Sequence, residues 1–197
     1  MNERILNNYY NIGKFNHPSR IGYMMKMIRD LKPLTQDEWR LWYYNNVHDE
    51  QYVKDIATEM HSTIPVDYCI TVDDCLVYVE DVMFRRTFNG YNKEKLSLKL
   101  LRDYISPDVK ESPADWDTKY FIDFYLETHK ALLGIQLKPD TFYRGNYQYK
   151  VDIRGKMKAF ERAYNAISYI LLYQQHSSQD GIVFANPEVL DEIKSFV

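Results

Sequence analysis

The sequence predicts an α/β protein with a small mixed β-sheet flanked by helices and preceded by a helical N-terminal region. The stretch Tyr120–Pro139 alternates apolar and polar residues with a period of two, which is typical of a β-hairpin. The segments before and after it repeat apolar residues at helical spacing. The late run Gly181–Ala185 is continuously apolar, as expected of a buried strand.

Length and composition restrict the class of protein. A chain of 197 residues can form one domain with a substantial core, and a net charge of −3 requires any nucleic-acid-binding surface to be local. Because the sequence has no apolar run of about 18 residues and no apolar signal region at its start, we expect a cytoplasmic protein without a membrane span. Cys69 and Cys75 are separated by five residues, outside the usual zinc spacing, so we expect free buried thiols.

Residues 1–62 are predicted to form a helical region that packs on the core or extends it. The Asn-rich residues 1–14 fit either a loose arm or a first helical turn. A helix is expected from Pro18, since proline is favoured at a helix start. Thr35 and Glu38 have capping-box spacing, which predicts the start of a second helix there. A third helix is expected over Asp49–His61.

Residues 63–197 are predicted to form the core. Before the hairpin we expect a strand or loop over Cys69–Val72, a helix from Val72, a break at Arg85–Gly90, a helix over Lys93–Tyr104 and a loop over Ser106–Asp117. The break follows from Asn89-Gly90, a strong turn pair. After the hairpin we expect a strand or extended loop over Tyr147–Ile153, a helix over Lys156–Gln174, the strand Gly181–Ala185 and a closing helix over Pro187–Phe196. The strand Gly181–Ala185 should join the hairpin sheet through a helical crossover.

The hairpin carries unusual polar residues. If its strands pair around a turn at Thr128–Lys130, Asp123 lies beside Gln136 and Lys138. Hydrolysis of a DNA phosphodiester needs a bound metal ion, a positioned water and help for the leaving oxygen. Asp123 would be the main anionic metal ligand, with the Gln136 amide oxygen and the Leu137 backbone carbonyl as further ligands. Lys138 would orient the attacking water or stabilise the developing charge.

Asp123, twelve intervening residues and then Gln136-Leu137-Lys138 resemble the PD-(D/E)XK nuclease motif. Ile122 stands where the motif has proline, and Gln136 stands where it has an acid. The second departure makes another carboxylate necessary.

The resemblance implies that the helix before the hairpin supplies this acid. Glu94 is our first candidate and Glu80 the reserve. The implied catalytic residues are then Asp123, Gln136, Lys138 and Glu94. The implied cofactor is Mg²⁺, for which Mn²⁺ could substitute.

A wider pattern resembles type II restriction endonucleases of the MjaI type, which cut CTAG. The resembling stretches are NHPSRIGYM, the Trp39–Tyr44 helix, RRTFNGYNKE, KYFIDFYLE with GIQLKP, and GIVFANPEVLDEI. The resemblance implies a restriction-endonuclease-like core and a homodimer that cleaves double-stranded DNA at a palindrome. It also implies 5′-phosphate ends and a cognate methyltransferase that protects host DNA without forming a stable complex.

A local excess of positive charge predicts the DNA-binding surface. Between Arg144 and Arg162 the basic residues outnumber the acidic ones by a net +4, in a chain of net −3. The candidate DNA contacts there are Arg144, Asn146, Gln148, Lys150, Arg154, Lys156 and Lys158. Arg144, Asn146 and Gln148 could contact base edges, while lysines and tyrosines would contact phosphates. His17 and Arg20 form a second candidate group.

Two alternatives remain from the sequence. The protein could be a structure-specific repair or recombination nuclease of the same fold. It could also be a DNA-binding protein whose catalytic site has decayed, for which the amide at Gln136 is the main argument.

Overall fold

The structure is a computed structural model, which describes residues 3–144, 147–175 and 181–197. It divides into two compact units, Met1–Asn92 and Lys93–Val197. The predicted division into a helical region 1–62 and a core 63–197 stays a prediction. None of the helices in the described ranges is long and apolar enough to cross a membrane.

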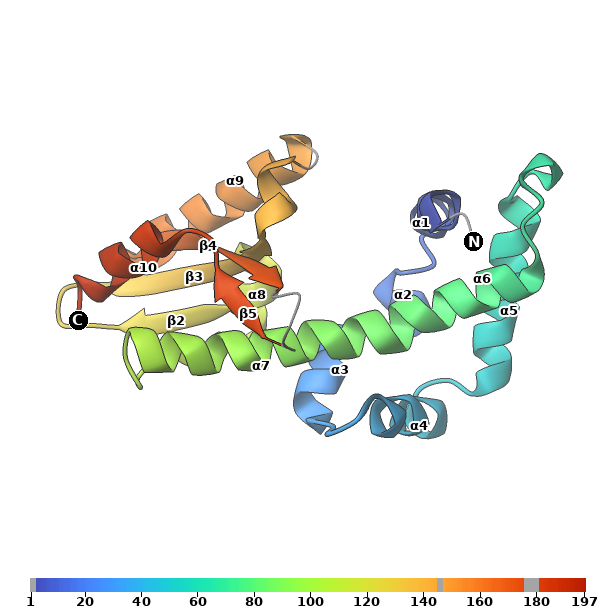
Figure 1. The fold of residues 1–197 in the computed structure, drawn as a ribbon, viewed down its shortest axis with the longest axis horizontal. Coiled ribbons are helices and arrows are strands. Elements are labelled where there is room, and N and C mark those ends of the chain that lie inside the picture. Colours follow the sequence, from blue (N-terminus) through green and yellow to red (C-terminus); the bar gives the residue numbers. More distant parts are fainter. Residues whose placement is uncertain (1–2, 145–146, 176–180) are drawn as a thin grey trace. The chain divides into compact units, whose positions relative to one another are not determined.

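The unit Met1–Asn92 is helical, as predicted (Figure 1). Its elements are α1 (Glu3–Ile12), α2 (Pro18–Ile21), α3 (Met24–Leu31), α4 (Gln36–Asn46), α5 (Glu50–Thr63), a 3₁₀ turn (Val66–Tyr68), α6 (Val72–Glu80), a π-helical segment (Asp81–Arg86) and the start of α7 (Thr87–Tyr104). The Asn-rich start is therefore a helix. The side chains of Thr35, Asp49 and Thr71 each accept a backbone N–H at the starts of α4, α5 and α6.

The predicted break at Arg85–Gly90 is wrong. A π-helical segment occupies Asp81–Arg86 and α7 follows it directly, so Asn89 and Gly90 lie inside a helix. The turn preference of Asn89-Gly90 is outweighed by packing, because the helical segment before it buries apolar side chains. Met83 and Phe84 pack in the core with Trp39. Trp39 also donates its indole N–H to the Met83 carbonyl at 3.2 Å.

The core of this unit also corrects the expectation for the cysteines. Both are free, but only Cys75 is buried, whereas Cys69 is exposed. Cys69 ends the 3₁₀ turn with a left-handed backbone conformation (φ 50°). The segment expected as a strand or loop over Cys69–Val72 is therefore a loop, and it leads into the capped start of α6.

The unit Lys93–Val197 contains a five-stranded mixed sheet with strand order β1-β2-β3-β4-β5. The strands are β1 (Lys110–Glu111), β2 (Phe124–Glu127), β3 (Leu132–Pro139), β4 (Ile167–Gln175) and β5 (Ile182–Phe184). The helical elements after α7 are α8 (Ala114–Tyr120), a 3₁₀ turn (Asp140–Arg144), α9 (Tyr147–Tyr164) and α10 (Pro187–Lys194). β3 and β4 are parallel, and the other neighbouring pairs are antiparallel.

The predicted hairpin is present as β2 and β3. Its turn is closed by Thr128, whose N–H donates to the Ala131 carbonyl at 3.0 Å. The first strand begins later than expected, at Phe124, because α8 extends through Tyr120 and ends with Phe121 in a left-handed conformation. Asp123 lies directly before β2 and remains attached to β3, since its N–H donates to the Ile135 carbonyl at 2.9 Å.

Two predictions after the hairpin are wrong. The segment Tyr147–Ile153 begins helix α9 and is neither strand nor loop. The expected helix Lys156–Gln174 ends at Tyr164, and Ile167–Gln175 forms β4. Asn165 has a φ of 50°, which ends the helix, and the β-branched and aromatic residues that follow favour a strand.

The crossover strand is consequently β4 and not Gly181–Ala185. α9 carries the chain from β3 to the parallel strand β4, and β5 (Ile182–Phe184) returns antiparallel at the edge. The predicted loop Ser106–Asp117 also contains a short strand, β1, and the first turn of α8.

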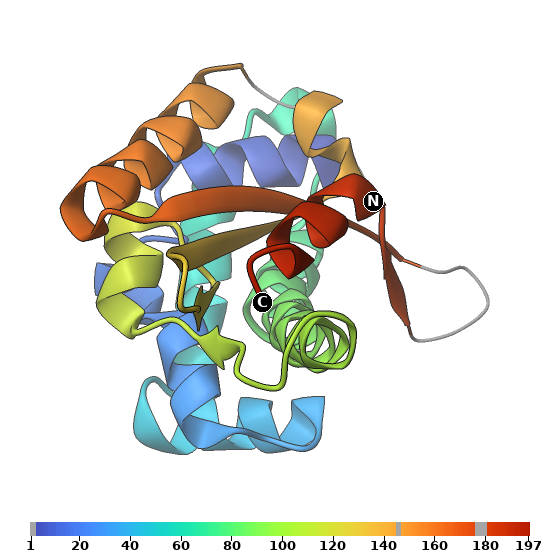
Figure 2. The same cartoon turned by 90° about the vertical axis from the view of Figure 1, so that its left-hand side faces the viewer.

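Helices cover both faces of the sheet in this unit, and Figure 2 shows α9 and α7 on opposite sides of β4. One face packs Leu133, Ile135 and Leu137 of β3 against α7 and α10. The other face packs against α8 and α9. Gly134 allows this second contact, because a Cβ at this position would lie 2.7 Å from the Phe160 ring.

Candidate active site

The start of β2 brings Asp123 and Gln136 together. One carboxylate oxygen of Asp123, Oδ2, accepts a hydrogen bond from Gln136 Nε2 and another from the Leu137 N–H at 2.7 Å. Gln136 Nε2 also lies 3.3 Å from the Leu137 carbonyl oxygen. Hairpin pairing therefore places the predicted ligands Asp123, Gln136 and Leu137 in direct contact.

The environment of Asp123 favours its neutral form. Burial raises its pKa to about 7; the Leu137 hydrogen bond lowers the pKa, the negative charges of Glu94 and Asp117 raise it, and the Lys138 ammonium lowers it. The charge of Glu94, on α7, thus acts on the Asp123 carboxyl. Asp123 as a whole residue keeps part of its surface in contact with solvent.

Lys138 lies two residues after Gln136 on β3 and contacts aromatic residues. Its Nζ lies 3.5 Å from the Tyr149 hydroxyl, 5.8 Å from the centre of the Tyr149 ring and 5.9 Å from the centre of the Phe121 ring. Tyr149 belongs to α9 and Phe121 to the end of α8. Two helices that pack on one sheet face therefore orient the predicted catalytic lysine.

Tyr173 of β4 is a neighbour of this group that we did not predict. Burial raises the pKa of Tyr173, and the charges of Asp123 and Glu94 raise it further. Lys93 Nζ lies 5.7 Å from the centre of its ring. Because Tyr173 falls in the segment that we expected to be helical, its approach to the hairpin could not be predicted from its spacing.

Glu80, the reserve acid, has structural contacts within the unit Met1–Asn92. Its Oε1 accepts hydrogen bonds from Arg40 at 2.6 Å and from the Tyr44 hydroxyl at 3.0 Å. These contacts give Glu80 a role in joining α4 to α6, whereas the charge of Glu94 acts on Asp123.

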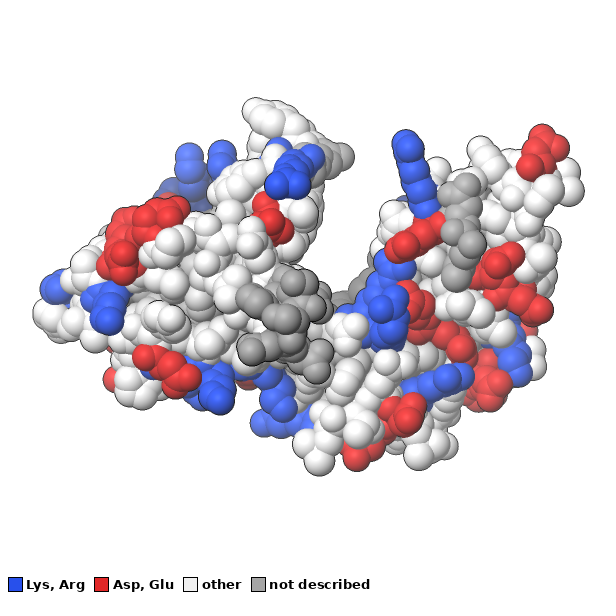
Figure 3. Space-filling view, in the orientation of Figure 1, with Lys and Arg blue, Asp and Glu red and all other residues white. Residues whose placement is uncertain are grey.

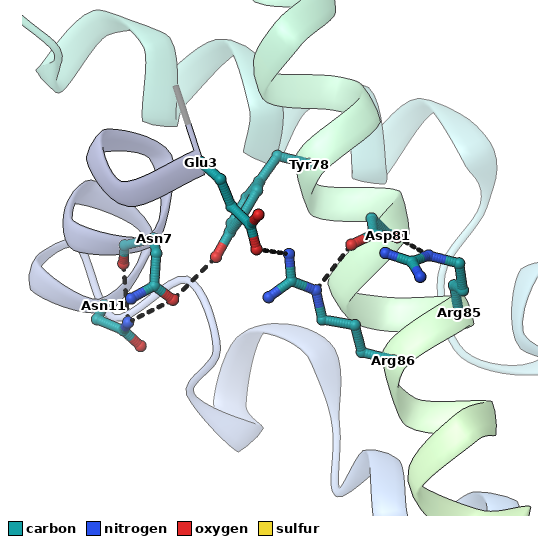
Figure 4. Close-up of polar contacts among 7 residues, drawn as sticks. All are labelled: Glu3, Asn7, Asn11, Tyr78, Asp81, Arg85 and Arg86. Carbon is teal, nitrogen blue, oxygen red and sulfur yellow. Dashed lines mark hydrogen bonds and ion pairs between the residues drawn. The ribbon is translucent and has the colours of Figure 1, made fainter. Parts of the chain in front are cut away.

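The two arginines of the RRTFNGYNKE stretch also have partners. Arg85 and Arg86 both pair with Asp81, and Arg86 pairs with Glu3 at 2.8 Å, as Figure 4 shows. The Arg86 guanidinium lies 5.2 Å from the centre of the Tyr78 ring. This network fixes the π-helical segment to α1 and α6.

Most of the predicted DNA contacts lie on or next to α9. Lys150 donates to the Tyr143 carbonyl at 2.9 Å, and Arg154 lies 5.8 Å from the centre of the Tyr143 ring. Lys150, Arg154 and Lys158 follow each other at intervals of four residues, which places them on one helix face. Lys156 lies away from that face, 4.0 Å from the centre of the Phe121 ring. The basic residues of α9 therefore lie on two different faces of the helix.

The other predicted DNA contacts are less uniform. Arg144 is exposed at the end of the 3₁₀ turn before α9, and Gln148 donates to Asp152 at 2.9 Å. Asn146 lies outside the described residues. Figure 3 shows Lys and Arg interspersed with Asp and Glu on the visible face of each unit.

His17 and Arg20 have local structural contacts. His17 caps α2, since its Nδ1 accepts the Ser19 N–H at 3.2 Å. Arg20 forms two hydrogen bonds of 2.8 Å with Glu59 and lies 4.8 Å from the centre of the Phe15 ring. A DNA contact by Arg20 would have to compete with this bidentate ion pair.

The oxygen donors suit a hard cation. Among the residues that the structure describes, no three His, Cys, Asp or Glu side chains form a group that could hold a metal ion. Gln136, however, is only 2% exposed and its Oε1 has no hydrogen-bond partner. An unpartnered buried oxygen beside a carboxylate fits the oxygen ligands that Mg²⁺ prefers. Among the predicted ligands, Asp123 and Gln136 lie in direct contact, whereas Glu94 is linked to them through its charge.

Comparison with known proteins identifies a family for the chain. The model of the family described as MjaI restriction endonuclease matches residues 3–186, which include both units' main elements and the Asp123–Lys138 hairpin. No curated protein and no solved structure matches the chain. Restriction endonucleases bind DNA and hydrolyse its phosphodiester bonds, and the match covers most of the sequence. The chain therefore belongs to the MjaI restriction endonuclease family.

Proposed function

We propose that the protein is a type II restriction endonuclease that cleaves double-stranded DNA at CTAG by Mg²⁺-dependent hydrolysis, leaving 5′-phosphate and 3′-hydroxyl ends. The family match supports the reaction class. The observation that carries the assignment to particular residues is the contact of Asp123 with Gln136 and Leu137, two residues before Lys138 on the same strand. We assign this group to the PD-(D/E)XK type.

Asp123, Glu94, the Gln136 amide oxygen and the Leu137 carbonyl would hold Mg²⁺, or Mn²⁺ in its place. When bound, the ion would supply the Lewis acidity that phosphodiester hydrolysis requires. For the Gln136 oxygen to serve as a ligand, the amide must turn away from its present hydrogen bond with Asp123. Lys138, two residues after Gln136 on β3, would orient the attacking water and stabilise negative charge on the phosphate.

DNA contacts would come from both predicted groups of basic residues. Lys150, Arg154, Lys156 and Lys158 would contact phosphates, while Arg144, Asn146 and Gln148 would reach base edges. His17 and Arg20 are further candidates. A palindromic site implies a homodimer, because a twofold-symmetric protein presents the same contacts to each half-site. A cognate methyltransferase would protect host DNA.

Plasmid digestion tests the proposal directly. The purified protein should convert a plasmid with several CTAG sites into discrete fragments with Mg²⁺, and sequencing of the ends should give one cut position. Lys138→Ala should abolish cleavage, while Lys130→Ala, in the turn before β3, should cleave normally. Lys130 is a suitable control because its Nζ donates to the Ser195 carbonyl at 2.7 Å, away from Asp123. Random fragmentation, or equal cleavage by wild type and Lys138→Ala, would refute the assignment.

One observation favours a second candidate, a DNA-binding protein without cleavage activity. Gln136 provides an amide where the resembled motif has a carboxylate, so the donor set carries less negative charge. This candidate predicts salt-dependent DNA binding with no cleavage in Mg²⁺ or Mn²⁺. A structure-specific repair nuclease has less support, since the match is to a restriction endonuclease family. Cleavage of flaps or junctions with no fixed duplex sequence would restore it.

A further inference from the structure

Phe121 has an unusual backbone conformation beside the candidate active site. It ends helix α8 with a φ of 57°, and its N–H donates to the Asp117 carbonyl at 3.0 Å. Glycine is the residue usually found at such a left-handed helix end, because a side chain is unfavourable there. A large aromatic residue at this unfavourable position suggests that the contacts of its ring matter to the protein.

The Phe121 ring lies close to two lysines from different elements. Lys156 Nζ of α9 is 4.0 Å from the ring centre, and Lys138 Nζ of β3 is 5.9 Å from it. Both distances are within the range of cation–π attraction. Lys138 also contacts Tyr149, whose hydroxyl lies 3.5 Å from its Nζ. Phe121 thus holds one cation at the end of the catalytic strand and a second from the helix that crosses the sheet.

We infer that Phe121 is a positioning residue that holds Lys138 and Lys156 as a pair, and that this pair binds the oxygens of one DNA phosphate. Two ammonium groups near one ring repel each other, and a bound anion relieves that repulsion. Lys138 directly follows Gln136 and Leu137 on β3, and both of these residues donate hydrogen bonds to Asp123. Lys156 therefore acts at the reaction centre, whereas Lys150, Arg154 and Lys158 lie on another face of α9.

This inference rests on the proposed nuclease site, so its test is DNA binding, which does not require cleavage. A CTAG-containing duplex is titrated in EDTA with wild type, Phe121→Gly, Lys156→Met and the double variant. Glycine suits the left-handed conformation at residue 121, so Phe121→Gly removes the ring while the backbone keeps its preference. Phe121→Tyr keeps an aromatic ring. Lys119→Met is the matched control, because Lys119 Nζ lies 4.9 Å from the centre of the adjacent Tyr120 ring.

We expect Lys156→Met to weaken binding about three- to tenfold and to reduce the slope of log Kd against log salt by about one. Phe121→Gly should weaken binding by a similar factor, and the double variant should lose less affinity than the product of the two single factors, because Phe121 acts partly through Lys156. Phe121→Tyr and Lys119→Met should bind like wild type. Where wild type cleaves, Phe121→Gly should also reduce the single-turnover rate at saturating protein at least tenfold, since Lys138 loses its position.

The possible failures are distinguishable. If Phe121→Gly binds like wild type, or if the effects of Phe121→Gly and Lys156→Met add independently, the inference is wrong whatever the cleavage result. Another outcome is that wild type fails to cleave while the two single variants and the double variant show the expected coupling in binding. In that case the proposed function fails and the paired phosphate site stands. Thermal unfolding of each variant shows whether a binding defect follows from loss of the fold.

Discussion

Replacing Asp123 with Asn should stabilise the protein near neutral pH. Burial raises the pKa of the Asp123 carboxyl from 3.8 to about 7. Between these two values the unfolded chain has lost the proton while the folded protein keeps it, so the stability of wild type falls as the pH rises. Well below pH 3.8 the carboxyl is protonated in both states and the penalty is absent. Asparagine is neutral throughout and avoids it.

The magnitude follows from the pKa difference. A difference of about three pKa units corresponds to about 4 kcal/mol at about 1.4 kcal/mol per unit. Because Asp123 is partly exposed to water, we expect roughly half of this, about 2 kcal/mol. Asparagine can retain the local geometry, since its carbonyl oxygen can accept the Gln136 and Leu137 hydrogen bonds that Asp123 Oδ2 accepts now.

Urea unfolding of wild type and Asp123→Asn at several pH values between 4 and 8 measures the effect. The stability difference should be near its minimum at pH 4 and should grow by about 2 kcal/mol in favour of Asn by pH 8, or roughly 5 °C in Tm. Glu127→Gln, an exposed position at the far end of β2, should show no such pH dependence. Added Mg²⁺ should raise the Tm of wild type at pH 8 and leave that of Asp123→Asn unchanged. A difference that stays constant between pH 4 and 8 would refute the reasoning.

Three further substitutions test the surroundings of this site and the fold. In Glu94→Gln, stability should fall at a lower pH than in wild type, because the Glu94 charge raises the pKa of Asp123. An unchanged dependence of the unfolding free energy on pH would contradict the interaction of the two residues. Gly134→Ala should destabilise the protein by about 1–3 kcal/mol in urea unfolding, since its Cβ would lie 2.7 Å from the Phe160 ring, and wild-type stability would argue against that packing. Gly90→Ala should stabilise the protein by about 0.5–1 kcal/mol, because residue 90 is helical and, among the residues that the structure describes, its Cβ would meet only Met25 Sδ, at 3.9 Å; destabilisation would instead indicate a turn.

The hairpin could be predicted because its pattern is local. The period of two, the short polar turn and the spacing of Asp123 from Gln136 together determine which residues meet. The segment Ile167–Gln175 could not be predicted in the same way. Its apolar residues also fit a helical spacing, and the choice of strand depends on pairing with β3 and on the left-handed conformation of Asn165. Long-range pairing overrides the local pattern there.

The candidate site shows the same division. Asp123, Gln136 and Lys138 could be proposed from one short stretch, and Glu94 from the helix before it. Phe121 and Tyr173 could not, because their roles depend on which elements pack together. Phe121 follows an α-helix in a segment that we expected to be a strand. Tyr173 reaches the hairpin only because β4 is its parallel neighbour.

The Gln136–Asp123 hydrogen bond has a consequence for the order of events before cleavage. Two ionised carboxylates at these positions would repel each other until a cation arrived, so the site would be loosely held without one. With an amide at 136, the Gln136 Nε2 can donate a hydrogen bond to Asp123 as soon as the chain folds, and binding of the proposed ion would exchange that partner for another. Such a site would assemble independently of the ion supply, at the cost of a rotation of one side chain each time the ion binds.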